Sequence, residues 1–274
     1  MTATGTGPAG STLQRSQQRS SLGCSAAPVA LLGRGRPCVD TLRHRQLYRP
    51  SDVCANLPEV QSQRMYIPPH FAQTKPEVLH RIMREHPLGT LVRTEEGALD
   101  ADHIPFEFDP EAGPLGTLKA HVARANTLWQ RCPTGTPVLA IFRGNEAYIS
   151  PNWYPSKHET HRQVPTWNYE VVHAHGTLSI HDDERYVRAL VARLTRHHDA
   201  AEPKPWKMGE APPDYIQMML SNIVGIEVRI TSLVGKSKLS QNREARDRRN
   251  AADTLQTRGH EGLAEAMRQG VPPT

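Results

Sequence analysis

The stretch IVGIEVRITSLV, residues 223–234, alternates apolar and polar side chains through most of its length. Successive side chains of a β-strand point to opposite faces, so this alternation predicts a strand with one buried face. Residues 167–180, WNYEVVHAHGTLSI, are similarly rich in β-branched and aromatic residues and predict a second long strand. These two stretches indicate that the fold is built on a β-sheet.

Shorter elements surround these two strands. Further strands are predicted at residues 89–93, 99–108, 115–122, 138–142 and 147–150, the last two as a hairpin around RGNE, residues 143–146. Helices are predicted at about 75–86, where Thr74 and Glu77 have capping-box spacing, and at 123–131, 182–197, 215–220, 241–257 and 260–269, with a long loop at 151–165.

The connection lengths favour mostly antiparallel strands with helices inserted between them. We therefore predict a mainly β fold with helices (α+β), organised as a small barrel. The sequence contains no alternating βαβ units and no GxGxxG or GxxxxGK[ST] loop. This excludes the common Rossmann and P-loop nucleotide sites.

Residues 1–64 differ from the rest of the chain in charge. Of the 33 basic and 28 acidic residues, eight arginines and three acids lie here, which leaves 25 of each sign in residues 65–274. The formal charge of +5 therefore belongs to the first segment, and the remainder has no general electrostatic affinity for nucleic acid. The first segment is rich in Ser, Gly, Pro and Arg and shows no sustained period, so we predict a disordered extension over 1–64 and one domain over 65–274.

The start of the chain and its cysteines bear on where the protein works. The Arg- and Ser-rich extension superficially matches an organelle transit peptide, but we favour a natural start at Met65, where a coherent domain begins. Three of the four cysteines lie in the extension, and Cys132 alone belongs to the domain, which is typical of a reducing cytoplasmic setting. No run of about 18 apolar residues occurs, so no membrane association is expected.

Several separated motifs occur along residues 65–256 in one order. They are MYIPPHF (65–71), ARAN (123–126), YISPNWY (148–154), VPTWNY (164–169), and IVGIEV leading into GKSKLSQNR (235–243). Together these motifs resemble those of the PaiB family of flavin-binding negative transcriptional regulators. The resemblance implies a split β-barrel that binds flavin mononucleotide (FMN) at the interface of a homodimer.

The residues themselves suggest how such a cofactor would be held. A phosphate needs cations and hydrogen-bond donors, and a flat ring needs apolar walls with a few polar partners. Candidate phosphate ligands are Lys236, Lys238, Ser240 and Arg243 on a turn after the last strand, or Arg124 and Asn126 before a helix. Candidate ring walls are Trp129, Trp153 and Trp167, and the motifs also supply His121, Ser150, Asn168 and Gln241.

Each of these candidates has a structural alternative. Trp153 and Trp167 also fit a core or a dimer interface, and Asn126 and Asn168 also fit turn caps. Lysines after a strand are commonly solvated. His103 is a further candidate for a polar contact with flavin, whereas no catalytic residue and no metal site can be nominated, since HETH (158–161) lacks the HExxH spacing.

Three functions remain open on the sequence. The first is a flavin-binding transcriptional regulator, with direct DNA binding or an indirect partner, since residues 243–249 form a basic run that helix pairing also explains. The second is a flavin-dependent oxidoreductase or flavin reductase on the same barrel. The third is a haem-binding split barrel with His158, His161 or His260 as the iron ligand.

Overall fold

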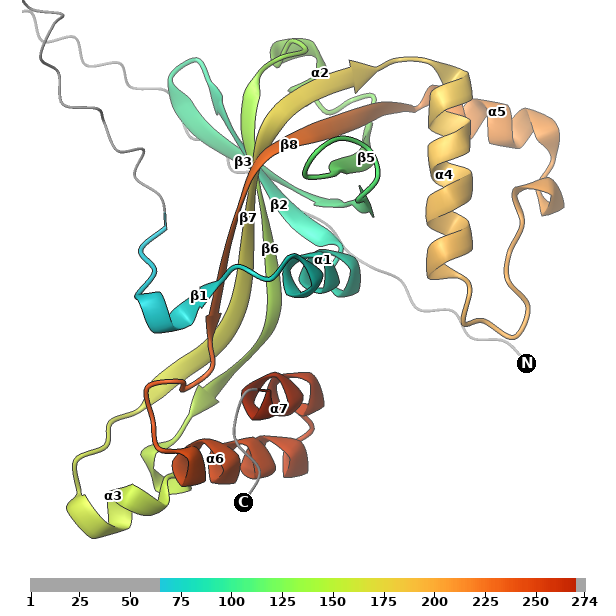
Figure 1. The fold of residues 1–274 in the computed structure, drawn as a ribbon. Helices are drawn as coiled ribbons and strands as arrows, with labels where there is room; N and C mark the ends of the chain where they lie inside the picture. Colours follow the sequence, from blue (N-terminus) through green and yellow to red (C-terminus); the bar gives the residue numbers. More distant parts are fainter. Residues whose placement is uncertain (1–64, 270–274) are drawn as a thin grey trace, which may run out of the picture. The chain divides into compact units, whose positions relative to one another are not determined.

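The computed structural model describes residues 65–269, so the predicted disordered extension at 1–64 lies outside the described residues (Figure 1). Residues 65–269 form one large antiparallel sheet with helices around it, which confirms the predicted α+β class. Within this part of the chain, no helix combines the length and the apolar composition needed to cross a lipid bilayer.

Three long strands form the centre of the sheet. β6 (Pro137–Ile149), β7 (Thr166–His181) and β8 (Ile223–Lys238) lie side by side, and β7 pairs with both neighbours over most of its length. The other strands extend the sheet in the order β3-β2-β6-β7-β8-β5-β4, and β1 pairs with the far end of β8. They are β1 (Ala72–Gln73), β2 (Leu88–Glu95), β3 (Ala98–Pro105), β4 (Glu107–Asp109) and β5 (Thr117–Ala123).

The sheet curls until β3 lies close to β5, and we call this curled part of the sheet the barrel. No backbone ladder joins these two described strands, but Asn126, just after β5, donates from Nδ2 to Asp102 Oδ1 of β3 at 2.8 Å. Arg131, in the short helix α2 (Leu128–Arg131), forms an ion pair with Glu95 at the end of β2. Side-chain contacts therefore connect these parts of the sheet where backbone hydrogen bonds do not.

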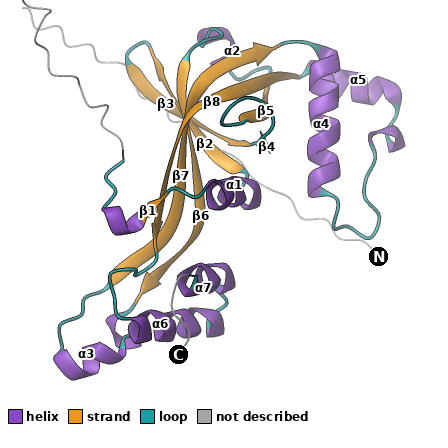
Figure 2. Cartoon of the chain, viewed as in Figure 1, coloured by secondary structure: helices purple, strands orange, loops and turns teal. Residues whose placement is uncertain are grey.

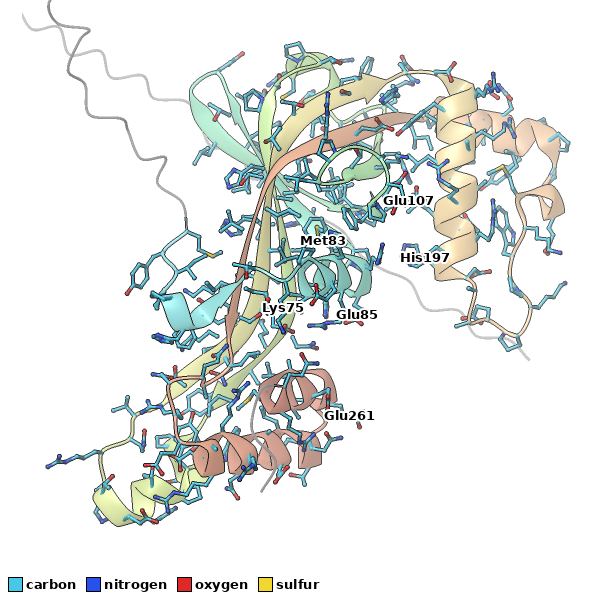
Figure 3. All side chains as sticks on the ribbon, in the orientation of Figure 1. Lys75, Met83, Glu85, Glu107, His197 and Glu261 are labelled. Atoms are coloured by element: carbon cyan, nitrogen blue, oxygen red, sulfur yellow. The ribbon has the colours of Figure 1, made fainter. Side chains whose placement is uncertain are left out.

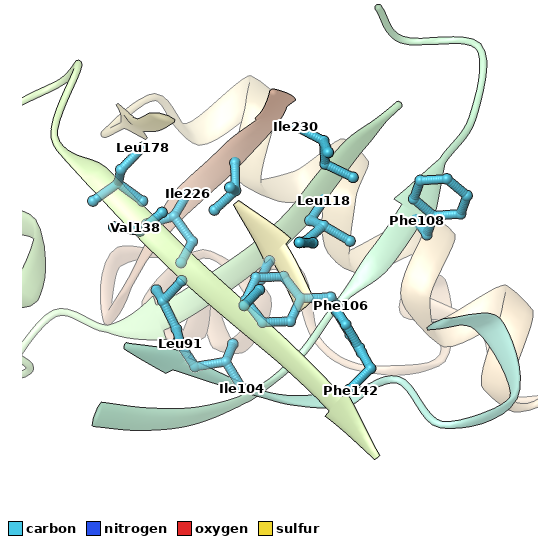
Figure 4. Close-up of a cluster of buried hydrophobic side chains, with 14 of the residues drawn as sticks. Leu91, Ile104, Phe106, Phe108, Leu118, Val138, Phe142, Leu178, Ile226 and Ile230 are labelled. Atoms are coloured by element: carbon cyan, nitrogen blue, oxygen red, sulfur yellow. The ribbon is translucent and has the colours of Figure 1, made fainter. Parts of the chain in front are cut away.

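The inside of the curled sheet is apolar. Figure 4 shows side chains from several strands meeting there. Helix α1 (Pro76–Glu85) adds Leu79, Ile82 and Met83 to the same core, and Met83 is labelled in Figure 3. Alternate residues of β8 face this core, as the sequence pattern predicted: Val224, Ile226, Val228 and Ile230. The alternation therefore sets which face of β8 is buried.

Two groups of helices lie at opposite ends of β8 (Figures 1 and 2). Near its start, α4 (Glu184–His198) and α5 (Pro213–Ser221) pack around Val187, Ile216 and Leu220. Figure 3 shows Glu107 of β4 beside α4. The Nε–H of Arg193 in α4 is shared between the two carboxylate oxygens of Glu107, at 3.0 Å from each. We call α4 and α5, with the connection between them, the α4–α5 lobe.

At the other end lie α3 (Pro155–Thr160), α6 (Ala245–Thr257) and α7 (Glu261–Arg268), where α6 contacts both α3 and α7, and α7 packs against the end of β6. We call these three helices, with the nearby ends of β6, β7 and β8, the C-terminal module. Its core joins Ile149, Tyr154, Leu255 and Met267 with several alanines. Short 3-10 helices lie at Pro69–Phe71, Pro151–Trp153 and Met208–Glu210.

The predicted hairpin at 138–150 is wrong, because β6 is one continuous strand. Arg143 pairs with Val171 and Glu146 with Tyr169, so two residues of β6 lie opposite one residue of β7. The RGNE residues, which favour a turn, form a β-bulge instead, and both halves of the strand remain paired with β7. Pairing with a long neighbour has overridden the local turn signal.

Several helix and strand boundaries also differ from the predictions. The strand predicted at 99–108 is divided into β3 and β4, and the helix predicted from residue 241 begins at Ala245. The loop at 151–165 contains α3, because Pro151 and Pro155 each occupy the first turn of a helix, where proline is favourable. The capping box predicted from Thr74 and Glu77 does not form, because α1 begins at Pro76 with Lys75 as its N-cap. Helix α2 is shorter than predicted, and β8 runs on to Lys238.

Candidate functional site

The structure divides the twelve candidate cofactor residues into two groups. His121, Arg124, Asn126 and Trp129 lie in or just after β5, and the other eight lie at the C-terminal module: Ser150, Trp153, Trp167, Asn168, Lys236, Lys238, Ser240 and Gln241. His121 pairs with Gly225, near the start of β8, whereas Lys236 lies eleven residues further along that strand. At about 3.3 Å per residue, roughly 36 Å of strand length separates the two groups. One chain therefore does not bring them together.

In the first group, Arg124 is already paired. Its guanidinium meets both carboxylate oxygens of Asp182 at 2.9 and 2.5 Å, and its Nε donates to Ser221 O at 2.6 Å. The hydrogen bond that Arg124 donates to Asp182 raises the pKa of Arg124. The guanidinium also lies 5.5 Å from the ring centre of Trp129, whose Nε1 donates to Arg124 O at 2.9 Å. These contacts fix the turn after β5.

Asn126 and His121 complete this group. Asn126 accepts from Leu128 N at 2.8 Å and donates to Asp102, so it caps the turn before α2 and bridges to β3. His121 is half-buried, and its Nδ1 has no hydrogen-bond partner among residues 65–269. Burial lowers the pKa of His121, which favours the neutral ring.

A buried arginine next to this group was not identified from the sequence. Arg93 of β2 is 4% exposed and forms ion pairs with Asp100 at 2.6 Å, with Glu95, and with Asp102. Arg93 and Asp100 are cross-strand partners in the β2–β3 hairpin, so the register of that hairpin brings them together. Through Asp102 this network also reaches Asn126.

In the second group, Lys236 and Lys238 lie within β8 rather than on a turn after it. Gly235 precedes them without a positive φ, and a Cβ there would lie 2.2 Å from Leu79 Cδ2. The glycine therefore permits the close approach of α1 and does not form a phosphate loop. The two lysines are two residues apart and share one face of the strand, as the sequence predicted.

Three aromatic side chains share that face. Directly opposed residues of paired strands lie on the same side, so Lys238 lies beside Tyr169, and Trp167 beside Tyr148. Tyr148 and Trp167 are 48% and 49% exposed, and their ring centres are 6.4 Å apart. We call Tyr148, Trp167, Tyr169, Lys236 and Lys238 the aromatic–lysine face.

The two ammonium groups of this face are partly engaged. Lys236 Nζ donates to Tyr66 O at 3.0 Å and lies 5.4 Å from the ring centre of Tyr169. Lys238 Nζ donates to Trp167 O at 2.7 Å and to Thr166 Oγ1. Burial, with the nearby charges of Lys236 and Arg243, lowers the pKa of Lys238. An ammonium has three donors, so these bonds leave two on Lys236 and one on Lys238.

Asn168, Ser240 and Gln241 have their polar atoms committed to the fold. Ser240 Oγ lies 3.0 Å from the Tyr154 hydroxyl and accepts from Asn168 Nδ2 at 2.9 Å. Gln241 accepts from Leu239 N at 2.7 Å and donates to Ser237 O at 2.5 Å. Ser240 has a positive φ of 62°, and these bonds hold the chain in that turn. These bonds shape the C-terminal module, so the three side chains are engaged within the fold.

Ser150, Trp153 and Trp167 line a pocket of about 660 Å3 at the edge of β6. Arg258 and His260, which the sequence analysis missed as a pair, also line it, and the Arg258 guanidinium lies 4.9 Å from the ring centre of Trp153. The one local signal was Gly259 between them, a helix break with a φ of 81°. The pocket offers aromatic walls with a cation at the rim, which suits a flat anionic ligand.

Comparisons with known proteins agree with the sequence motifs. Residues 65–232 match the family described as "Putative FMN-binding domain". The chain is 31% identical over 192 residues to Protease synthase and sporulation protein PAI 2 of Bacillus subtilis, covering 70% of this chain and 89% of that protein. It is 29% identical over 253 residues to an uncharacterised protein of Aspergillus fumigatus, covering 75% and 97%.

A solved structure with a similar backbone is the flavocytochrome Anf3 from Azotobacter vinelandii. The TM-score is 0.46 at 13% identity, over 66% of this chain and 76% of that one, and a likeness of this size carries no argument about function. The family match spans more than half of the chain, and PAI 2 is matched over most of its length. The chain therefore belongs to the PaiB family of proteins with an FMN-binding domain.

Proposed function

We propose that this protein is an FMN-binding regulatory protein that acts as a homodimer, with the flavin on the aromatic–lysine face. The observation that carries the proposal is the strand register, which places Lys236 and Lys238 beside Tyr148, Trp167 and Tyr169 on one side of three adjacent strands. Exposed aromatic rings supply walls for a flat ring system. The three remaining lysine donors supply cationic hydrogen bonds for a phosphate.

The distance between the two groups of candidate residues supports the dimer. If the turn after β5 also contacts flavin, its residues must come from a second copy, because roughly 36 Å of β8 separates the two groups in one chain. Large apolar side chains are also exposed on β2 and β3, at one edge of the sheet, where Leu88 and Leu99 are 65% and 79% exposed. A second copy would cover such surface.

An indirect route to regulation fits the basic run at 243–249 better than direct DNA binding. Arg246 forms ion pairs with Glu159 of α3 and with Glu244, and Arg248 is 9% exposed and donates to Gln269 O at 2.8 Å. Arg246 therefore pairs with residues outside its own helix rather than with a residue four positions away along α6. A charge that is neutralised within the fold adds little to the attraction of a phosphate backbone.

The direct test is a comparison of FMN with riboflavin. The purified protein should show flavin absorbance, and replacing both Lys236 and Lys238 by alanine should weaken FMN binding by about 100-fold, about 2.7 kcal/mol. Riboflavin lacks the phosphate, so its affinity should change little. A matched variant that removes two exposed cations elsewhere, Arg185→Ala with Lys204→Ala, should bind both ligands normally.

Other outcomes would change the proposal. Equal loss of FMN and riboflavin in the lysine variant would mean that these lysines support the fold or the ring, and the phosphate assignment would be wrong. A Soret band in place of flavin absorbance would favour the haem-binding alternative. Oxidation of NADPH by the flavin-loaded protein at enzymatic rates would favour the oxidoreductase.

A further inference from the structure

A second cavity lies in the α4–α5 lobe, well away from the aromatic–lysine face. It has a volume of about 360 Å3 and is bounded by α4, by α5, by the connection between them and by the outer side of the sheet. Eight of its nine lining residues are apolar or aromatic, and the ninth is His121 of β5: the eight are Val191, Trp206, Met208, Tyr215, Ile216, Met219, Leu220 and Ile223. The volume is within the usual range for small-molecule sites, roughly 300–1,000 Å3.

The floor of this cavity is built by packing that exists without a ligand. Ile216 and Leu220 of α5 are buried against Val187 of α4, and Ile223 packs against the same cluster. Arg124 also ties the end of α5 to the sheet through its hydrogen bond to Ser221 O at 2.6 Å. The α4–α5 lobe is therefore held in place by the packing that forms the cavity floor and by a hydrogen bond outside the cavity.

The rim of the cavity carries large apolar side chains that are partly exposed to solvent. Trp206, Tyr215 and Met219 all line the cavity and are 41%, 48% and 45% exposed. Aromatic rings favour stacking on a flat ligand, and the flexible thioethers of Met208 and Met219 adapt to its outline. This lining selects a planar apolar molecule rather than a chain of polar groups.

His121 adds one polar feature to this apolar lining. Leu118, Ala120 and Val122 of β5 face the barrel core, so His121 lies on the outer face of the strand, toward the α4–α5 lobe. Its Nδ1 has no partner among the described residues, which is unusual for a buried polar atom. Because burial disfavours the charged ring, the histidine suits a neutral ligand with one hydrogen-bonding group.

We propose that this cavity binds a small, neutral, planar aromatic molecule that carries a single hydroxyl or ring N–H for His121. The cavity shares none of its nine lining residues with the aromatic–lysine face, so the proposal does not depend on flavin at that face. It assigns His121, one of the twelve candidate flavin residues, to this cavity instead. In a regulatory protein such a site would accept an effector.

The test uses 1-naphthol and naphthalene as probes with the full chain, with excess FMN present to occupy any flavin site. Isothermal titration should give saturable binding of one 1-naphthol per chain. Met219→Glu places a charge in the cavity wall and should weaken this binding at least about tenfold. Met218→Glu is the matched control, since its side chain is 51% exposed on the same helix and does not line the cavity, so it should change the affinity less than about twofold.

A second variant tests the role of His121. Replacement by phenylalanine keeps a ring of similar size without the nitrogens, so His121→Phe should lose the preference for 1-naphthol over naphthalene while still binding naphthalene. The proposal is overturned if 1-naphthol shows no saturable binding or if the two methionine variants lose affinity equally. It is also overturned if Met219→Glu instead dissociates an oligomer, because the cavity would then be a contact between copies.

Discussion

The barrel and the C-terminal module share three strands but are held together in different ways. The barrel interior is filled by apolar side chains from every wall, such as Leu91, Phe142 and Ile226. The module also buries polar groups, among them Asn168, Ser240, Asp247 and Arg248, which are bonded to specific partners. Apolar packing tolerates small shifts, whereas a buried hydrogen bond requires one geometry. The module should therefore be more sensitive to exchanges of single polar atoms.

The largest effect is expected in the barrel. Phe142 is fully buried and its ring meets that of Phe106, with 5.8 Å between ring centres, so Phe142→Ala should reduce the free energy of unfolding by about 3–5 kcal/mol. Urea denaturation followed by far-UV circular dichroism measures this loss. Val164→Ala, at a side chain that is 65% exposed, serves as the control and should change stability by less than about 0.5 kcal/mol. A loss below 1 kcal/mol for Phe142→Ala would mean that the barrel core repacks freely.

The next effect is expected in the module. Asp247 is 1% exposed and accepts from Ser156 N at 3.0 Å and from Ser156 Oγ at 2.5 Å, which joins α6 to α3. Asp247→Ala leaves both donors without this partner and should cost about 2–3 kcal/mol. Hydrogen exchange should show the loss of protection confined to α3 and α6, with the barrel amides still protected.

The matched control for this variant is Asp253→Ala on the same helix. The Asp253 side chain is 68% exposed and pairs with Arg268, so its loss should be within about 0.5 kcal/mol. If Asp247→Ala instead lowered protection throughout the barrel, the two regions would be one cooperative unit and the contrast between them would fail.

The smallest effect concerns a polar group in the barrel wall. Burial lowers the pKa of His121 below its ordinary value of about 6.5, so the unfolded chain binds a proton there more readily than the folded one. This contribution is absent well above pH 6.5 and destabilises the fold as the pH falls below that value. His121→Phe should therefore make the free energy of unfolding depend less steeply on pH between 7.5 and 5.5.

A control separates this linkage from general weakening of β5. Val122 is 5% exposed next to His121, and Val122→Ala should lower stability by a similar amount at both pH values. Denaturation series at pH 5.5 and 7.5 give both slopes. A steeper slope in His121→Phe than in the unmodified protein would show that the sign of the linkage is reversed.

The sequence predicted the strands better than the turns between them. The alternation in β8 and the composition of β7 reflect a buried face that each strand presents along its whole length, so a local pattern carries the information. The bulge at RGNE was misinterpreted because Gly and Asn favour a turn locally, whereas pairing with β7 continues on both sides. Strand pairing is non-local, and no window of β6 alone contains it.

The same division applies to the candidate site. The motifs, which the sequence alone provides, determined the family and drew attention to Lys236, Lys238 and Trp167, which the strand register then places on one face. Only the tertiary structure showed that Asn168, Ser240 and Gln241 are internal hydrogen-bond partners and that Arg258 reaches Trp153. Residue type and spacing specify which chemistry a side chain can perform. Whether its polar atoms remain available depends on partners distant in the sequence, which the fold alone brings together.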